Sequence, residues 1–327
     1  MTRRPFGALG EVSALTLGGA GLMGGWGHAP DLDEAVATIR AAVDAGVDHI
    51  DVAPGYGDGG AERAVGAAFG GALPAGVQIS TKVPLDRPSP GAAPGLIERS
   101  LNASLERLRL PRVDLLLTHC WLLPDGEEGA GRSGVPFRDY VQEVRPALER
   151  LVADGRIGAW GISGIGAPVT VQQALLARPR PAAVQAIANV LSSAGEEVPF
   201  RGPSTGSVAV AAAAAGVPVI GIRAVGRGAL ADVLDKQVDD DHPIAVDYRR
   251  AAGLRSLARA RGVPAARLAY RYALSLPEVA TVAIGVRNRA ELADALAAER
   301  DGVLDAADTL SLRDACRHHG GGEVTSE

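Results

Sequence analysis

The chain has 327 residues, of which 47% are apolar and 22% charged, and its formal net charge is −5. This composition is typical of a globular protein and not of a low-complexity one. A mildly acidic chain without a basic block argues against a nucleic-acid partner. The longest apolar stretch, residues 208–222, contains Pro218 and is shorter than the roughly 20 residues of a membrane span, so no membrane association is expected.

Cysteine and histidine usage limits the kind of site that the chain can build. Only Cys120 and Cys316 are present, without a CxxC pair, which excludes a disulfide scaffold and a cysteine zinc site. No His-x-His pair occurs, which disfavours a metal-dependent hydrolase, and we predict no metal site. The amino-terminal residues lack the apolar stretch of a signal peptide. We therefore expect a cytoplasmic protein, either a monomer or a small homo-oligomer.

Short β-branched or leucine-rich runs alternate with amphipathic segments along the chain. The runs predict eight strands, at residues 14–17, 48–52, 78–82, 113–118, 157–162, 183–187, 217–222 and 281–284. The segments between them predict helices, among them residues 32–45, 94–108, 141–153 and 265–274. Strands joined by crossover helices form a parallel sheet. Eight such units in roughly 290 residues predict an α/β fold of the (β/α)8 TIM barrel type, rather than an open doubly wound sheet.

Three segments fall outside this repeat. Residues 1–12 predict a short hairpin lid with a turn near residues 9–10. Residues 247–261 predict one inserted helix, and residues 309–319 predict a carboxy-terminal helix followed by a loose tail. We expect a single domain over residues 1–327, with the barrel over about residues 13–300 and a carboxy-terminal extension over residues 301–327.

Two sequence motifs of folds that bind a nicotinamide cofactor can be checked directly in this chain. Gly19, Gly21 and Gly24 spell GxGxxG after the first barrel strand, but a Rossmann fingerprint must open a helix. The next residues are glycine- and proline-rich, which predicts a loop instead. A short-chain dehydrogenase needs a tyrosine four residues before a lysine. The two lysines of the chain have Gln78 and Asp232 at those positions, so that class is excluded.

Polar residues stand at the carboxyl ends of three successive predicted strands. Asp51 lies near the end of the second strand, Lys82 ends the third, and His119 follows the fourth. Tyr56 comes five residues after Asp51. Each of these residues alone is more often a cap, a rim residue or a solvated side chain. In a barrel, however, the carboxyl ends of the strands meet on the face that holds the active site. The four together, including one of only two lysines, predict a catalytic constellation.

Several motifs resemble the aldo-keto reductase superfamily. They are HIDVAPGYG at 49–57, ISTKV at 79–83, VDLLLTH at 113–119, WGISG at 160–164 and AVQAIANVL at 183–191. The resemblance extends from near residue 13 to residue 296. It implies an eight-stranded barrel that binds NAD(P)(H) without a Rossmann fold and interconverts carbonyl compounds and alcohols.

The chemistry of carbonyl reduction explains why these residue types would be needed. Hydride addition builds negative charge on the carbonyl oxygen, which requires a proton donor. A free tyrosine, with a pKa of about 10, holds its proton tightly, and a nearby ammonium stabilises the phenolate. The expected roles are Tyr56 as general acid/base, Lys82 as the ammonium and Asp51 as its partner. His119 would hydrogen-bond the substrate oxygen.

The same resemblance implies residues that contact the cofactor. Ser163 and Gln185 would hold the carboxamide, although Gly164 stands where the family usually has asparagine. Ile222 would pack under the nicotinamide ring. Gly19 and Ala20, which replace a common Thr-Trp pair, would line its pocket.

The phosphates would be contacted by two further segments. Gly226, Arg227 and Leu230 resemble the loop that covers the pyrophosphate, and Gly285, Arg287, Asn288 and Arg289 resemble the adenosine phosphate segment. Because a guanidinium suits phosphate oxygens, Arg287 or Arg289 would bind a 2′-phosphate, which favours NADP(H) and leaves NAD(H) open. The alternative for either arginine is a solvated helix start.

Substrate choice is expected to lie in the loops. Trp26 and Trp121 would form pocket walls, with core packing as the alternative, and Cys120 is expected to be packed and unreactive. The expected substrate is a small aldehyde, ketone, sugar or alcohol. Two other functions stay open: a non-enzymatic cofactor-binding accessory protein, and a lyase that uses Lys82 as a Schiff base.

Overall fold

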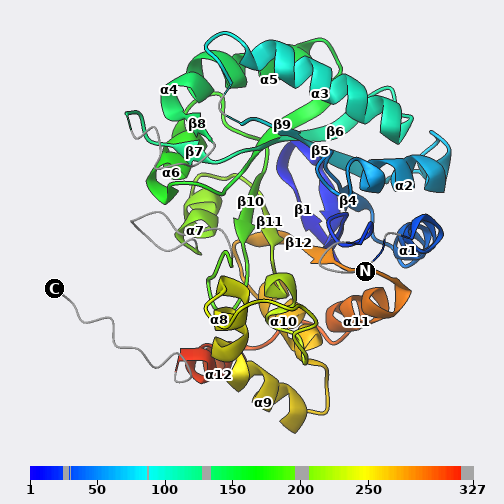
Figure 1. Cartoon of the computed structure of the whole chain (residues 1–327), viewed down its shortest axis with the longest axis vertical. Helices are drawn as coiled ribbons and strands as arrows, with labels where there is room; N and C mark the ends of the chain where they lie inside the picture. The colour runs from blue at the N-terminus through cyan, green and yellow to red at the C-terminus, as the bar shows by residue number, and fades with distance from the viewer. Residues whose placement is uncertain (25–28, 30, 87, 127–133, 196–205, 318–327) are drawn as a thin grey trace.

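The computed structural model describes residues 1–24, 29, 31–86, 88–126, 134–195 and 206–317. Its centre is a set of strands with helices around it (Figure 1). The strands form a closed parallel barrel, in which β12 pairs with β3 to complete the ring. This confirms the predicted (β/α)8 barrel. The barrel strands are β3 (Leu15–Gly18), β4 (His49–Asp51), β5 (Gln78–Pro84), β6 (Val113–His119), β9 (Ile157–Ser163), β10 (Val184–Ile187), β11 (Val219–Ile222) and β12 (Val279–Gly285).

Helices surround the strands, and α1, α3, α5 and α10 begin within a few residues of the predicted positions. They are α1 (Leu32–Asp44), α2 (Gly60–Phe69), α3 (Ala93–Leu108), α5 (Arg145–Ala153), α6 (Pro168–Leu176), α7 (Gly206–Ala214), α10 (Ala265–Leu274) and α11 (Arg289–Arg300). The Asp31 side chain accepts a hydrogen bond from the Glu34 amide at 3.0 Å and so caps α1. A turn over residues 19–23 precedes this helix, which agrees with a loop and not with a Rossmann helix.

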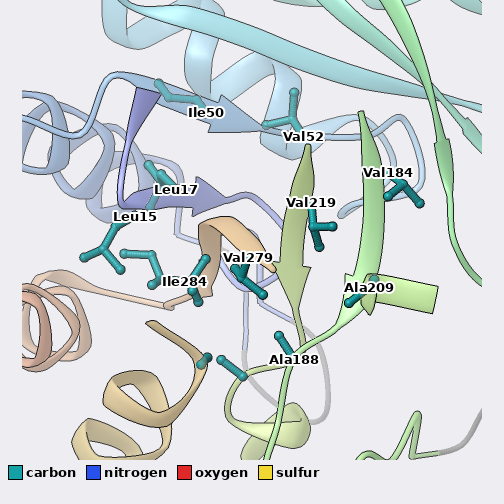
Figure 2. Packing of buried hydrophobic residues seen from close by; sticks show 14 of the residues in the cluster. Leu15, Leu17, Ile50, Val52, Val184, Ala188, Ala209, Val219, Val279 and Ile284 are labelled. Carbon is teal, nitrogen blue, oxygen red and sulfur yellow. The ribbon is translucent and has the colours of Figure 1, made fainter. Parts of the chain in front are cut away.

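Alternation along the strands sorts side chains between two clusters. Figure 2 shows part of the larger cluster, which contains Leu15, Leu17, Ile50 and Val52 and packs between the strands and the helices. A smaller, separate cluster includes Leu115, Leu117, Ala159 and Ile220. Because successive strand residues point to opposite faces, this second set lies inside the barrel. Residues of the same parity therefore point inward along each strand.

The amino-terminal hairpin is present but closes the opposite end of the barrel from the predicted active face. β1 (Arg3–Pro5) pairs with β2 (Glu11–Ser13), and the turn between them buries Phe6 completely in the inner cluster. The Arg4 guanidinium donates to the Val279 carbonyl at 3.1 Å, and the Gln78 amide donates to the Leu9 carbonyl at 3.0 Å. Val279 and Gln78 begin their strands. The hairpin is therefore a plug at the amino ends of the strands and not a lid over their carboxyl ends.

The prediction of one inserted helix over residues 247–261 is wrong. The segment belongs to two helices, α8 (Pro243–Arg250) and α9 (Ala252–Ala260), which are separated at Ala251. At Ala251 the backbone leaves the α-helical region, with ψ at 8°. α12 (Ala306–Arg317) packs against α9 so closely that a Cβ on Gly253 would lie 2.2 Å from the Ala315 carbonyl oxygen. This carboxy-terminal helix begins earlier than predicted because the Asp305 side chain accepts from the Asp308 amide.

The connection after β6 carries small elements of its own. β7 (Leu122–Leu123) pairs in parallel with β8 (Val135–Pro136), and α4 (Phe137–Asp139) continues through the π-helical turn η2 (Tyr140–Val144) into α5. Within the ranges given above, no helix is both long and apolar enough to cross a membrane.

Candidate active site

Asp51 and Lys82 form a buried ion pair at the carboxyl ends of β4 and β5. The Lys82 Nζ lies 2.6 Å from Asp51 Oδ2 and also donates to the Val52 carbonyl at 3.0 Å. The Ser80 hydroxyl and the Gln185 amide donate to the same carboxylate at 2.8 and 2.9 Å. The lysine is 1% exposed. The pair is thus fixed on its strands with its carboxylate fully engaged, which is what a buried charge requires.

Tyr56 and His119 lie against this ion pair. The Lys82 Nζ is 4.6 Å from the centroid of the Tyr56 ring. The rings of Tyr56 and His119 meet edge to face, with centroids 5.9 Å apart. The structure therefore brings together all four residues that the sequence predicts as catalytic. Tyr56 is only partly buried, so its side chain reaches the face on which a substrate would arrive.

The surroundings shift the pKa values of Lys82 and His119 in opposite directions. Burial disfavours the charged form of Lys82, but the Asp51 carboxylate and Tyr56 outweigh it and raise the pKa of the lysine. Burial, together with the positive charge of Lys82, lowers the pKa of His119 to about 4. At neutral pH the lysine is therefore an ammonium and the histidine a neutral ring that can donate and accept hydrogen bonds.

A buried carboxylate that sequence reasoning missed anchors the Tyr56 loop. Glu62, in the first turn of α2, is completely buried; it accepts from the Thr81 hydroxyl at 2.6 Å and pairs with Arg107 at 2.6 Å. Thr81 precedes Lys82 on β5. Glu62 therefore ties the helix that follows Tyr56 to the strand that carries the lysine. Ser80 was also missed, although its inward parity with Lys82 was a usable signal.

Ser163 and Gln185 lie side by side in the paired strands β9 and β10, as their predicted common role requires. The Ser163 Oγ is buried and has no hydrogen-bond partner among the described atoms. Such a hydroxyl suits an amide group of a bound molecule. The following residue has to be glycine, because a Cβ on Gly164 would lie 2.5 Å from the Gln185 carbonyl oxygen. Gly164, which stands where the family usually has asparagine, therefore lets the backbone after β9 lie close to β10.

The other residues expected near the nicotinamide lie on the same face. Ile222 ends β11 and is partly buried. Gly19 follows β3, and its amide donates to the Asp51 carbonyl at 2.7 Å. A Cβ on Gly19 would lie 2.8 Å from Val52 Cγ1, so this loop runs tightly over β4. Ala20, the next residue, is exposed.

The predicted pyrophosphate loop is a sharp turn after β11. The 3-10 turn η3 (Gly226–Gly228) places Gly226, Arg227 and Gly228 at φ values of 54°, 55° and 94°. This left-handed region favours glycine, which explains the Gly-x-Gly pattern. The Leu230 side chain is buried against the core behind the turn.

The predicted phosphate-binding arginines follow β12 and both contact carboxylates. Gly285 ends the strand and the Asn288 side chain caps α11 by accepting from the Glu291 amide at 3.0 Å. Arg287 pairs with Glu291 and Asp235, and Arg289 with Glu34. Sequence reasoning did not foresee these acidic partners.

Of the two tryptophans predicted as pocket walls, the structure describes Trp121. Trp26 lies outside the described residues. Trp121 follows His119 by two residues and is partly buried. Cys120 between them is buried, and burial raises the pKa of its thiol to about 12, which agrees with a packed and unreactive side chain. In the described ranges, no group of three histidine, cysteine or acidic residues could hold a metal ion.

The depressed pKa of His119 predicts a pH dependence of stability. The unfolded chain takes up a proton on this histidine below its ordinary pKa of about 6.5, whereas the folded chain does so only near 4. The free energy of unfolding should therefore fall as the pH is lowered, by about 2 kcal/mol between pH 7.5 and pH 5 from this residue. Urea unfolding at both pH values tests this. His119→Gln should show a correspondingly smaller loss, and an equal loss in both proteins would contradict the prediction.

Comparisons with known proteins agree with this geometry. The model of the Aldo/keto reductase family matches residues 14–315. L-galactose dehydrogenase of Arabidopsis thaliana is 26% identical over 311 residues, which cover 91% of this chain and 89% of the relative. Methylglyoxal reductase YeaE of Escherichia coli K12 is 33% identical over 162 residues, 48% of either chain.

A solved structure supports the fold independently. An aldo-keto reductase from Klebsiella pneumoniae, solved in complex with NADPH, superposes with a TM-score of 0.70 over 100% of this chain and 98% of its own, at 24% identity. At this identity the likeness concerns the fold. The family model, in contrast, spans the barrel from β3 to α12 and includes the four residues around Lys82. The chain therefore belongs to the aldo/keto reductase family of oxidoreductases.

Proposed function

We propose that this chain interconverts a carbonyl compound and an alcohol by hydride transfer, with NADP(H) as the favoured cofactor and Tyr56 as the general acid/base. The observation that carries the proposal is the buried Lys82–Asp51 ion pair, whose ammonium lies 4.6 Å from the centroid of the Tyr56 ring. An ammonium in this place stabilises a phenolate and so makes the tyrosine hydroxyl a usable proton donor.

The residues around Ser163 suit a nicotinamide. The buried hydroxyl of Ser163, which has no partner among the described residues, offers the hydrogen bond that a carboxamide needs, beside Gln185. That the Klebsiella pneumoniae relative was solved with NADPH supports NADP(H) for this chain, and NAD(H) is the second candidate. When bound, the nicotinamide would supply or accept the hydride.

The side chains would divide the remaining work. Tyr56 would donate its proton to the carbonyl oxygen as hydride arrives at the carbon, and Lys82 would stabilise the phenolate that remains. Asp51 would hold the ammonium in place through its 2.6 Å contact. His119, neutral because its pKa is lowered to about 4, would hydrogen-bond the substrate oxygen and orient it. In alcohol oxidation the same groups would act in reverse.

The relatives suggest which substrates to test first. One is named for the sugar L-galactose and another for methylglyoxal, a small aldehyde. We therefore propose a small neutral carbonyl or sugar as substrate, with the loops beyond β6 and β10 selecting among them.

An absorbance assay at the nicotinamide band tests the proposal. The purified chain would be offered NADPH and NADH in parallel with aldehydes, ketones and the oxidised forms of sugars, and NADP⁺ and NAD⁺ with sugars and alcohols. We expect cofactor-dependent turnover of at least one class, faster with the phosphorylated cofactor. Binding of cofactor without turnover of any class would favour an accessory protein instead. A borohydride-trapped adduct at Lys82 would favour the Schiff-base lyase.

A further inference from the structure

Arg287, in the segment between β12 and α11, is enclosed by two carboxylates. Its Nη1 lies 2.5 Å from Asp235 Oδ2, and its Nε lies 2.7 Å from Glu291 Oε1. The second carboxylate oxygen of Glu291 also accepts from the Arg287 backbone amide at 2.9 Å. Asp235 comes from the loop after β11, so the ion pair joins the two loops that the phosphates of a nucleotide would contact.

Arg289 is held by a carboxylate from the far end of the sequence. Glu34, in the first turn of α1, accepts from the Arg289 Nη2 at 2.9 Å, from its Nε at 3.2 Å and from its backbone amide at 2.9 Å. This bidentate geometry is the strong form of an arginine–carboxylate pair. It lowers the pKa of Glu34 to about 2, so the carboxylate is ionised throughout the physiological range.

In this region carboxylates therefore outnumber the guanidinium groups that they pair with. Two guanidinium groups face three carboxylates. A 2′-phosphate carries a charge of about −1.5 to −2 at pH 7. To bind either arginine it must displace or share a carboxylate and accept repulsion from the others. A ribose 2′-hydroxyl carries no such charge, and a carboxylate can accept its hydrogen bond.

We propose that Glu34, Asp235 and Glu291, here called the carboxylate set, oppose 2′-phosphate binding at Arg287 and Arg289. By doing so they limit the preference for NADP(H) and keep NAD(H) usable. This inference rests on the proposed function, since it assumes that the adenosine end of the cofactor lies over the segment after β12. Within that function, the carboxylate set lowers the selectivity for NADP(H) over NAD(H).

Calorimetric titration of the full chain with NADP⁺ and with NAD⁺, without substrate, tests the inference. Glu34→Gln and Asp235→Asn keep the shape of each side chain and remove one charge. Each should tighten NADP⁺ binding about 3- to 5-fold, which is the range of a partly exposed ion pair, and should leave NAD⁺ within about 2-fold. The double variant should tighten NADP⁺ about 10-fold, because the two carboxylates hold different arginines.

The chain offers a matched control at the other end of α11. Asp301 accepts from Arg267 Nε and Nη2, both at 2.6 Å, in the same bidentate form as Glu34 with Arg289. Asp301→Asn changes the net charge equally and should not alter either dissociation constant. The inference is overturned if NADP⁺ affinity is unchanged in both single variants, if NAD⁺ tightens equally, or if the control has the same effect. Failure of the wild type to bind either cofactor would instead overturn the proposed function.

Discussion

Tyr56→Phe should reduce turnover by about 10²- to 10⁴-fold, the usual contribution of a positioned general acid, while cofactor binding changes less than about 2-fold. The substitution removes the proton that the carbonyl oxygen needs. It keeps the ring that lies against Lys82 and His119, so the surrounding geometry should persist. Steady-state rates with the best substrate of the panel, together with titration of the cofactor, separate chemistry from binding.

A second tyrosine provides the control for this variant. Tyr248 is also partly buried, lies against the Arg255 guanidinium, and donates its hydroxyl to the Asp232 carbonyl at 3.0 Å. Tyr248→Phe removes one phenolic hydroxyl beside a cation but outside the catalytic constellation, and it should leave turnover unchanged. If Tyr56→Phe retained wild-type turnover, the assignment of Tyr56 as general acid would be wrong.

Asp51→Asn should destabilise the fold by about 3–5 kcal/mol, because it leaves the Lys82 charge buried without its counter-ion. The carboxylate also accepts from Ser80 and Gln185, and the amide that replaces it cannot accept from all three donors at once. Turnover should fall as well, because the ammonium would no longer be fixed beside Tyr56. Urea unfolding and steady-state kinetics at one pH measure the two effects.

A double variant separates the loss of stability from the loss of chemistry. In Asp51→Asn combined with Lys82→Met, neither charge of this ion pair remains, so most of the lost stability should return. Turnover should not return, because the ammonium is gone. Recovery of turnover in the double variant would show that Lys82 is dispensable. A single Asp51→Asn variant as stable as the wild type would show that the lysine finds another partner or loses its proton.

The sequence predicted the barrel and the clustering of Asp51, Tyr56, Lys82 and His119 for the same physical reason. Parallel strands put their carboxyl ends on one face, and alternation turns every second side chain inward. Asp51, Lys82 and His119 occupy inward positions at three neighbouring strand ends, so counting along the chain was enough to bring them together. Tyr56 lies near these residues because it comes only five residues after Asp51.

Contacts between distant segments could not be predicted in this way. Glu34 and Arg289 are 255 residues apart, and no periodicity relates them. Gln185 was assigned to the cofactor, and its bond to Asp51 depends on the closure of the barrel. The close approach of α12 to Gly253 likewise joins two distant segments. In each case the partner is chosen by packing of elements far apart in sequence, which local patterns do not encode.

The plug formed by the amino-terminal hairpin has a consequence for how the chain folds during synthesis. Arg4 bonds to the carbonyls of Val279 and Leu274, and β3 pairs with β12, so the first strands depend on the last ones. Pairings across such a sequence separation give the chain a high contact order, and they form late. While the ribosome is still translating, the barrel around the strands that carry Asp51, Lys82 and His119 is incomplete. The Asp51–Lys82 ion pair should therefore be shielded from water only after β12 has left the ribosomal exit tunnel.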